Sequence, residues 1–155
     1  MKALPFAALT VLLALPAVGR SQRSCPYINT ETVSGALQQP ATLSVRQQTP
    51  EGDVCDFLAG EGKMKRRLYV RVKTTTDPQH DYAKSREVCA GKPQVVNALG
   101  NEAWSCQLRC IPHGEAIFGR VRDTMFFIQM SGIPDDAILR DKASLAAEQV
   151  ANNLF

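Results

Sequence analysis

The chain contains none of the short motifs that mark a known catalytic or nucleotide-binding site. Its 155 residues include no Gly-x-Ser-x-Gly, no P-loop, no Gly-x-Gly-x-x-Gly and no Cys-x-x-Cys. Histidine occurs only at His80 and His113, and neither has a second His, Cys or carboxylate at metal-ligand spacing. We therefore expect no catalytic residue, metal site or cofactor, and both histidines to be solvated.

The chain also lacks a strong charge bias. Its 18 Lys and Arg against 15 Asp and Glu give a formal net charge of +3. A nucleic-acid-binding domain has a much stronger basic excess, so nucleic acid is not an expected partner. Beyond residue 19 no apolar run approaches the roughly 20 residues that a spanning helix needs.

The first 19 residues have the pattern of a secretion signal. Lys2 precedes an apolar run from Ala3 to Val18, and small residues at 17–19 suit a signal peptidase. The run is too short for a membrane anchor and contains two prolines. We expect cleavage near Arg20, export to the periplasm or the medium, and one mature domain over residues 20–155.

Alternating and helical patterns divide the mature chain into short elements. The expected order is helix, three strands, helix, three strands, helix. The helices are expected at 30–38, from 77 to about 90, and from 134 onward; the strands are expected at 42–46, 54–58, 68–73, 104–110, 116–121 and 125–130.

These elements predict an α+β fold. The connections within each strand trio are too short for parallel crossovers, which indicates two three-strand antiparallel meanders and raises the hypothesis of a pseudo-repeat. The strand at 125–130 is apolar on both sides, as in a central strand covered on both faces. Leu139, Ala143, Ala146 and Val150 form an apolar stripe, so the C-terminal helix is expected to cover the sheet.

The five cysteines are expected to form two disulfides, leaving one thiol free or paired between molecules. Cys106 and Cys110 fall on the same side of one predicted strand. They would then lie about 13 Å apart, too far to bond to each other. Either one can pair with Cys89, on the helix expected to cover that side.

Three short motifs resemble small exported bacterial proteins and lipoproteins built on a domain of unknown function. The motifs are Cys25-Pro26 before a helix, Cys55-Asp56-Phe57, and Leu99-Gly100-Asn101-Glu102-Ala103-Trp104 before a hairpin. The resemblance implies an α+β sandwich in the cell envelope and a Cys25–Cys55 disulfide, without an established activity. The chain differs by lacking a lipid-attachment cysteine and by having three further cysteines.

Basic residues gather on the polar sides of two predicted strands, namely Arg71 and Lys73 on one, Arg120 and Arg122 on the other. If these strands are neighbours, the four cations form a patch for anionic lipid or an envelope polymer. The alternative is a solvated, solubilising face.

We therefore expect an exported, non-catalytic binding or envelope-accessory domain. Its partner would be an anionic envelope component or another exported protein. The alternatives are a small extracytoplasmic hydrolase or redox enzyme, with clustered titratable groups in a cleft, and a carrier of an apolar ligand, with a cavity of several hundred Å³.

Overall fold

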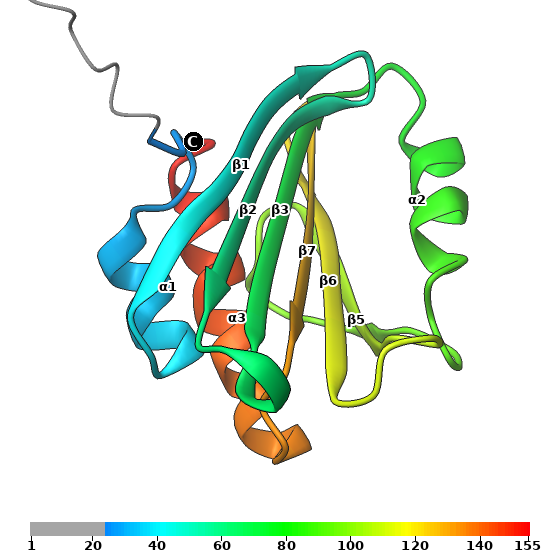
Figure 1. Ribbon diagram of the computed structural model, residues 1–155. Coiled ribbons are helices and arrows are strands. Elements are labelled where there is room, and N and C mark those ends of the chain that lie inside the picture. The colour runs from blue at the N-terminus through cyan, green and yellow to red at the C-terminus, as the bar shows by residue number, and fades with distance from the viewer. Residues whose placement is uncertain (1–23) are drawn as a thin grey trace, which may run out of the picture.

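The computed structural model describes residues 24–155, which form one seven-stranded sheet and three α-helices (Figure 1). The predicted signal peptide lies outside these residues. The helices are α1 (Thr30–Leu37), α2 (Pro78–Arg86) and α3 (Asp136–Asn152), with a 3₁₀ turn, η1, at Gly62–Met64. The strands are β1 (Ala41–Thr49), β2 (Gly52–Ala59), β3 (Arg66–Thr74), β4 (Gln94–Val95), β5 (Glu102–Gln107), β6 (Gly114–Val121) and β7 (Thr124–Ser131).

The sheet has the order β1-β2-β3-β7-β6-β5-β4, and every pairing is antiparallel. The predicted α+β class and both meanders are confirmed. The trios β1-β2-β3 and β5-β6-β7 are arranged symmetrically in the sheet, because β3 and β7 pair with each other and the other strands of each trio follow outward. The helices do not follow this repeat, because α1 and α2 lie on opposite faces of the sheet (Figure 1). β7 is central, as predicted from its apolar residues.

Helices α1 and α3 cover one face of the sheet and enclose the larger core. Asn29 caps α1 by accepting a hydrogen bond from the Thr32 amide at 2.7 Å. Asp135 caps α3 through the amides of Ala137 and Ile138. The predicted stripe of α3 is fully buried against the inward side chains of the strands, which include Phe57, Leu68, Val70, Ile117, Phe126 and Ile128.

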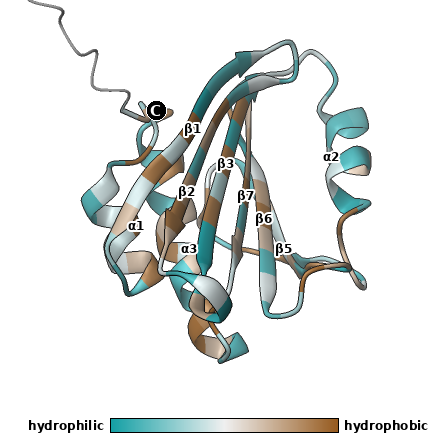
Figure 2. Ribbon diagram, viewed as in Figure 1, coloured by the Kyte–Doolittle hydropathy of each residue, from teal (hydrophilic) through white to brown (hydrophobic). Residues whose placement is uncertain are grey.

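Helix α2 covers the other face through a smaller core. Asp77 caps it through the amide of His80, and Pro78 occupies its first turn. Tyr82 is the large apolar side chain that α2 buries, since most of this helix is hydrophilic (Figure 2). It packs on Trp104 and Phe118, with ring centroids 4.4 and 6.4 Å away.

Neither helical layer extends over the whole sheet. On one face, α1 packs over β1–β3 and α3 over β6 and β7. On the other face, the α2 layer lies over β5–β7. Two surfaces at opposite ends of the sheet are therefore uncovered. One is the α2-side face of β1–β3, and the other is the α3-side face of β4 and β5.

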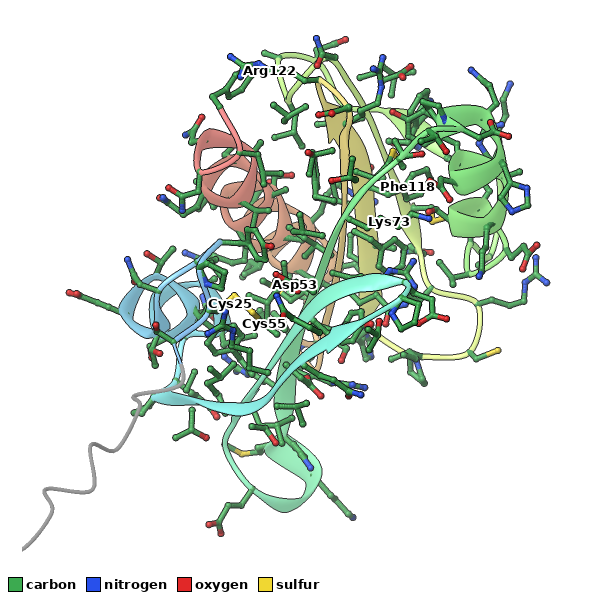
Figure 3. All side chains as sticks on the ribbon, turned by 90° about the horizontal axis from the view of Figure 1, so that it is seen from above. Cys25, Asp53, Cys55, Lys73, Phe118 and Arg122 are labelled. Atoms are coloured by element: carbon green, nitrogen blue, oxygen red, sulfur yellow. A yellow bond between two sulfur atoms is a disulfide. The ribbon has the colours of Figure 1, made fainter. Side chains whose placement is uncertain are left out.

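One disulfide joins Cys25 to Cys55 (Figure 3). A second joins Cys89 to Cys106, and Cys110 is free and exposed. Both predicted pairings are confirmed, with Cys106 as the partner of Cys89. Two disulfides in so small a chain indicate an oxidising compartment.

The placement of Cys89 and Cys110 differs from the prediction. Helix α2 ends at Arg86, and β5 ends at Gln107 rather than at residue 110. The Leu108 amide donates to the Gly114 carbonyl of β6 at 2.8 Å, and residues 109–113 form the turn between the two strands. Leu108 forms a single bridge with Cys89, and the Arg109 amide donates to the Val88 carbonyl at 2.8 Å. Cys110 is thus carried to the surface.

The exposed thiol of Cys110 predicts covalent dimers. Two copies oxidised at neutral pH are expected to couple through Cys110, because it is the cysteine left over after two internal bridges. Non-reducing electrophoresis after mild oxidation should show a band at twice the monomer mass, which Cys110→Ser removes. A dimer that persists in this variant would mean that one of the internal bridges exchanges.

Candidate binding site on the open sheet face

The four predicted basic residues do not form the expected patch. β7 lies between β3 and β6, so the two basic strands are not neighbours. Lys73 and Arg120 each pair with Met125 of β7, from opposite sides. Arg122 is not on a strand; it lies in the β6–β7 turn with a φ of 56°, away from Lys73 (Figure 3).

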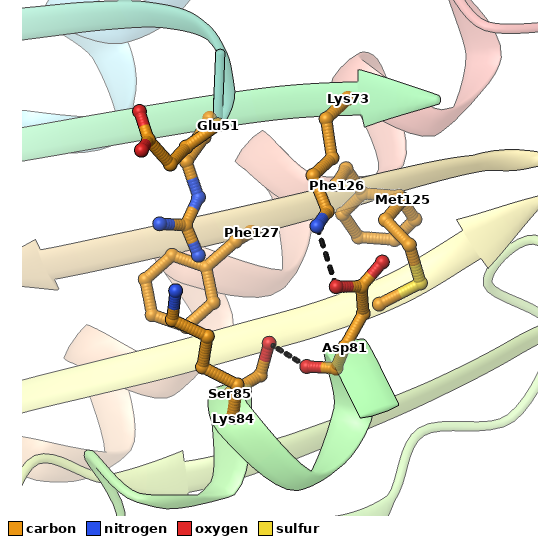
Figure 4. A pocket seen from close by; sticks show the side chains of 9 residues that line it. Glu51, Lys73, Asp81, Lys84, Ser85, Met125, Phe126 and Phe127 are labelled. Carbon is orange, nitrogen blue, oxygen red and sulfur yellow. Dashed lines mark hydrogen bonds and ion pairs between the residues drawn. The ribbon is translucent and has the colours of Figure 1, made fainter. Parts of the chain in front are cut away.

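Acidic side chains neutralise two of these cations. The ammonium of Lys73 contacts the Asp81 carboxylate of α2 (Figure 4). The Arg120 guanidinium lies 3.1 Å from the Glu102 carboxylate and also donates to the Arg122 carbonyl. Each of these cations is therefore held by a neighbour and offers little charge to a ligand.

Arg71 is placed differently. Its guanidinium lies 5.2 Å from the centroid of the Phe127 ring, a cation–π distance. Within residues 24–155, no carboxylate oxygen approaches it to 4 Å. Arg71 lines the narrow gap between β3 and α2 together with Glu51 and Lys84, at the border between the covered and the open parts of the sheet.

The gap itself is small. Its volume is about 30 Å³, which is roughly the space of one water molecule. An apolar-ligand carrier needs a cavity about ten times larger, so this gap gives that alternative no support. In the gap the hydroxyl of Ser85 donates to the Asp81 carbonyl at 2.8 Å (Figure 4), so it is held within its own helix.

The pKa of Asp81 reflects this environment. Burial raises the pKa of this carboxyl, but hydrogen bonds from Lys73 and Thr75 and the attraction of Lys73 and His80 outweigh burial and leave it lowered. Asp81 thus stays ionised near neutral pH and keeps its contact with Lys73. The pair joins α2 to β3 at the border of the open surface.

The open surface has polar and apolar side chains in two rows across β1, β2 and β3. One row is Gln47, Val54 and Arg71, and the other is Val45, Asp56 and Tyr69. Val45 is 41 % exposed. Asp56 is already paired, because Arg67 donates to both of its oxygens at 2.7 and 2.8 Å. The remaining groups of these rows are Gln47, the side chains of Val45, Val54 and Tyr69, and Arg71. Glu51 lines the same surface, and its pKa is lowered chiefly by a hydrogen bond from its own backbone, with a contribution from the attraction of Arg71, but the two side chains form no salt bridge.

These rows were not singled out as a site from the sequence. The strand pattern at 68–73 showed one polar side, but the pattern does not tell whether a helix covers it. The signal was present in β2, where Val54 and Leu58 fall on the side opposite to Cys55 and Phe57. Apolar residues on both sides of a strand, with one side left half-buried, indicate a contact surface.

Comparisons with known proteins identify no relative of this chain. No family model matches the chain, and no curated protein or solved structure matches it. The resemblance to small exported proteins that are built on a domain of unknown function therefore stays a hypothesis. Within residues 24–155, no helix is long and apolar enough to cross a membrane, and no three His, Cys, Asp or Glu side chains gather as a metal site.

Proposed function

We propose that this chain is an exported, non-catalytic domain that binds another exported protein on the open face of β1–β3. The observation that carries the proposal is Arg71, which forms no salt bridge within residues 24–155 and lies at the edge of an uncovered, partly apolar sheet face. The disulfides support an extracytoplasmic site of action, in agreement with the signal-like residues 1–19.

The chemistry of the surface favours a polypeptide over an anionic polymer. Val45, Val54 and Tyr69 present apolar area that a uniformly charged polymer would not use. Arg71 and the nearby Lys84 share the gap with Glu51, which leaves an excess of one positive charge and favours one carboxylate at the border with α2. The expected ligand is therefore an extended segment with an acidic residue next to apolar or aromatic ones.

Selection from a random dodecapeptide display library tests this assignment. We expect enriched peptides that carry Asp or Glu beside apolar residues. Arg71→Ser should weaken their binding roughly tenfold or more, since a hydrogen bond to a charged group contributes about 1.5–3 kcal/mol. Arg120→Ser is the matched control and should bind normally, because Arg120 is held by Glu102.

Two results would overturn the proposal. One is peptide binding that is equal in the wild type and Arg71→Ser. The other is the absence of enriched peptides together with salt-sensitive binding to phosphatidylglycerol vesicles that both arginine variants weaken alike. The second result would favour the anionic-surface function considered from the sequence.

A further inference from the structure

A second open surface, on the other face of the sheet, contains a polar pocket. It lies where β4 and β5 extend beyond the cover of α3. Gln94 is opposite Ser105, and Gln107 is opposite Glu115, so their side chains share the face toward α3. Lys92 and Arg140 add positive charge to the lining, around a space of about 320 Å³, near the lower end of the range for small-molecule sites.

Glu115 is the unusual residue of this pocket. It is 2 % exposed and falls in phase with Ile117 and Val121, whose side chains belong to the larger core. The nearest cation is Arg140 of α3, with 3.7 Å between its Nε and the carboxylate Oε1. This distance exceeds that of a hydrogen bond, and the Arg140 side chain is itself 48 % exposed.

The balance of forces leaves the Glu115 carboxylate poorly stabilised. Burial raises the pKa of Glu115 above its ordinary value; attraction by Arg140 and a hydrogen bond from Ser105 lower it without cancelling the effect of burial, and Asp136 raises it slightly. A buried carboxylate with free acceptor capacity is stabilised by a donor that enters the pocket.

The rest of the lining restricts what that donor can be. A metal ion is disfavoured, because Glu115 is the pocket's one carboxylate and two cations accompany it. A simple anion is disfavoured by the buried carboxylate. A molecule that carries an ammonium and a carboxylate pairs with the negative Glu115 and with the two positive side chains. The amides of Gln94 and Gln107 supply further hydrogen-bond donors and acceptors.

We propose that this pocket binds a free α-amino acid, with its ammonium on Glu115 and its carboxylate between Lys92 and Arg140. The inference is independent of protein binding on the β1–β3 face, since the two surfaces lie on opposite faces of the sheet. The pocket has the liquid volume of roughly ten water molecules, enough for an amino acid but not for a folded partner.

Isothermal titration calorimetry at pH 7 with the twenty L-amino acids, taken one at a time, tests the proposal. We expect at least one to bind at millimolar concentration or tighter. Its N-acetyl derivative lacks the ammonium, and the corresponding amine lacks the carboxylate. Both should bind at least tenfold more weakly. Binding of the N-acetyl derivative with equal affinity would overturn the role of Glu115.

Glu115→Gln removes the charge and keeps the shape of the side chain, so it should abolish binding. Lys92→Gln should weaken binding several-fold. Glu102→Gln makes the same change on the other face of the sheet, where Glu102 pairs with Arg120, and should leave affinity unchanged. Absence of binding by all twenty amino acids, or binding that survives in Glu115→Gln, would refute the site.

The folding of Glu115→Gln separates a lost site from a lost structure. Folding raises the pKa of Glu115. There is therefore a pH range in which Glu115 is protonated in the native state and ionised in the unfolded state. Stability therefore falls as pH rises through that range. Glu115→Gln should consequently unfold at an equal or higher temperature than the wild type at pH 7.

Discussion

Replacing Cys25 and Cys55 together by serine is expected to lower the free energy of unfolding by about 3–4 kcal/mol. The bridge spans 30 residues, and opening it restores the chain entropy of that loop to the unfolded state. Both cysteines are buried in the larger core, where the bridge fixes the segment before α1 to β2 (Figure 3). The loss is a large part of the 5–15 kcal/mol that typical domains have.

Urea and thermal unfolding, followed by circular dichroism, measure this effect. The midpoint temperature should fall by roughly 10–15 °C, given the enthalpy of a domain of this size. Cys110→Ser is the matched control, because it changes an exposed thiol that forms no bridge. A double variant as stable as this control would show that packing alone holds residues 25–28.

Phe118→Ala is expected to destabilise the protein by about 3–5 kcal/mol, the usual range for a large aromatic residue in a core. Phe118 is fully buried and lies in the middle of the smaller core, with ring centroids of Tyr82, Trp104 and Phe127 within 6.0–6.4 Å. Its removal leaves a cavity directly under α2.

The effect should be concentrated in the α2 layer. Near-ultraviolet circular dichroism should lose intensity, because Trp104 and Tyr82 lose a shared neighbour. Phe155→Ala is a suitable control, since Phe155 is 65 % exposed, and its unfolding midpoint should stay near that of the wild type. Equal stability of the two variants would mean that the smaller core contributes little to folding.

Local patterns in the sequence predicted most elements of this fold. The alternation of Leu68, Val70 and Val72 located β3, and the stripe from Leu139 to Val150 located α3 with its buried face. Asp77 and Asp135 act as caps because their carboxylates accept backbone hydrogen bonds in the first turn. These signals are reliable because they depend on neighbours within a few residues.

The arrangement of the elements depends on distant residues and was not predictable in the same way. The β3–β7 pairing joins residues that are 50 to 64 positions apart, and no local pattern specifies it. That pairing separates Arg71 from Arg120 and removes the expected patch. By contrast, the face that α2 covers was expected, because Cys89 was assigned to a helix over the Cys106 side of its strand, and Tyr82 of α2 packs on that side against Trp104.

Glu115 was missed for a different reason. The predicted strand begins at Ala116 and the predicted turn ends at Gly114, which leaves Glu115 assigned to neither. Its phase with Ile117 and Val121 was visible in the sequence and indicates an inward side chain. Extending the alternation one position toward the N-terminus would have identified a buried carboxylate, a residue type that is rarely buried without a partner.

The side-chain amide of Asn153 donates to the Tyr27 carbonyl at 2.8 Å, so the first and last parts of residues 24–155 meet at one corner, beside α1 and α3 (Figure 1). A short linker could join them, and new ends could be opened at the exposed β2–β3 turn, giving a circular permutant. The same geometry matters for any fusion or surface tether. Cargo attached at either end emerges on the α1–α3 side, and the β1–β3 face stays accessible on the other.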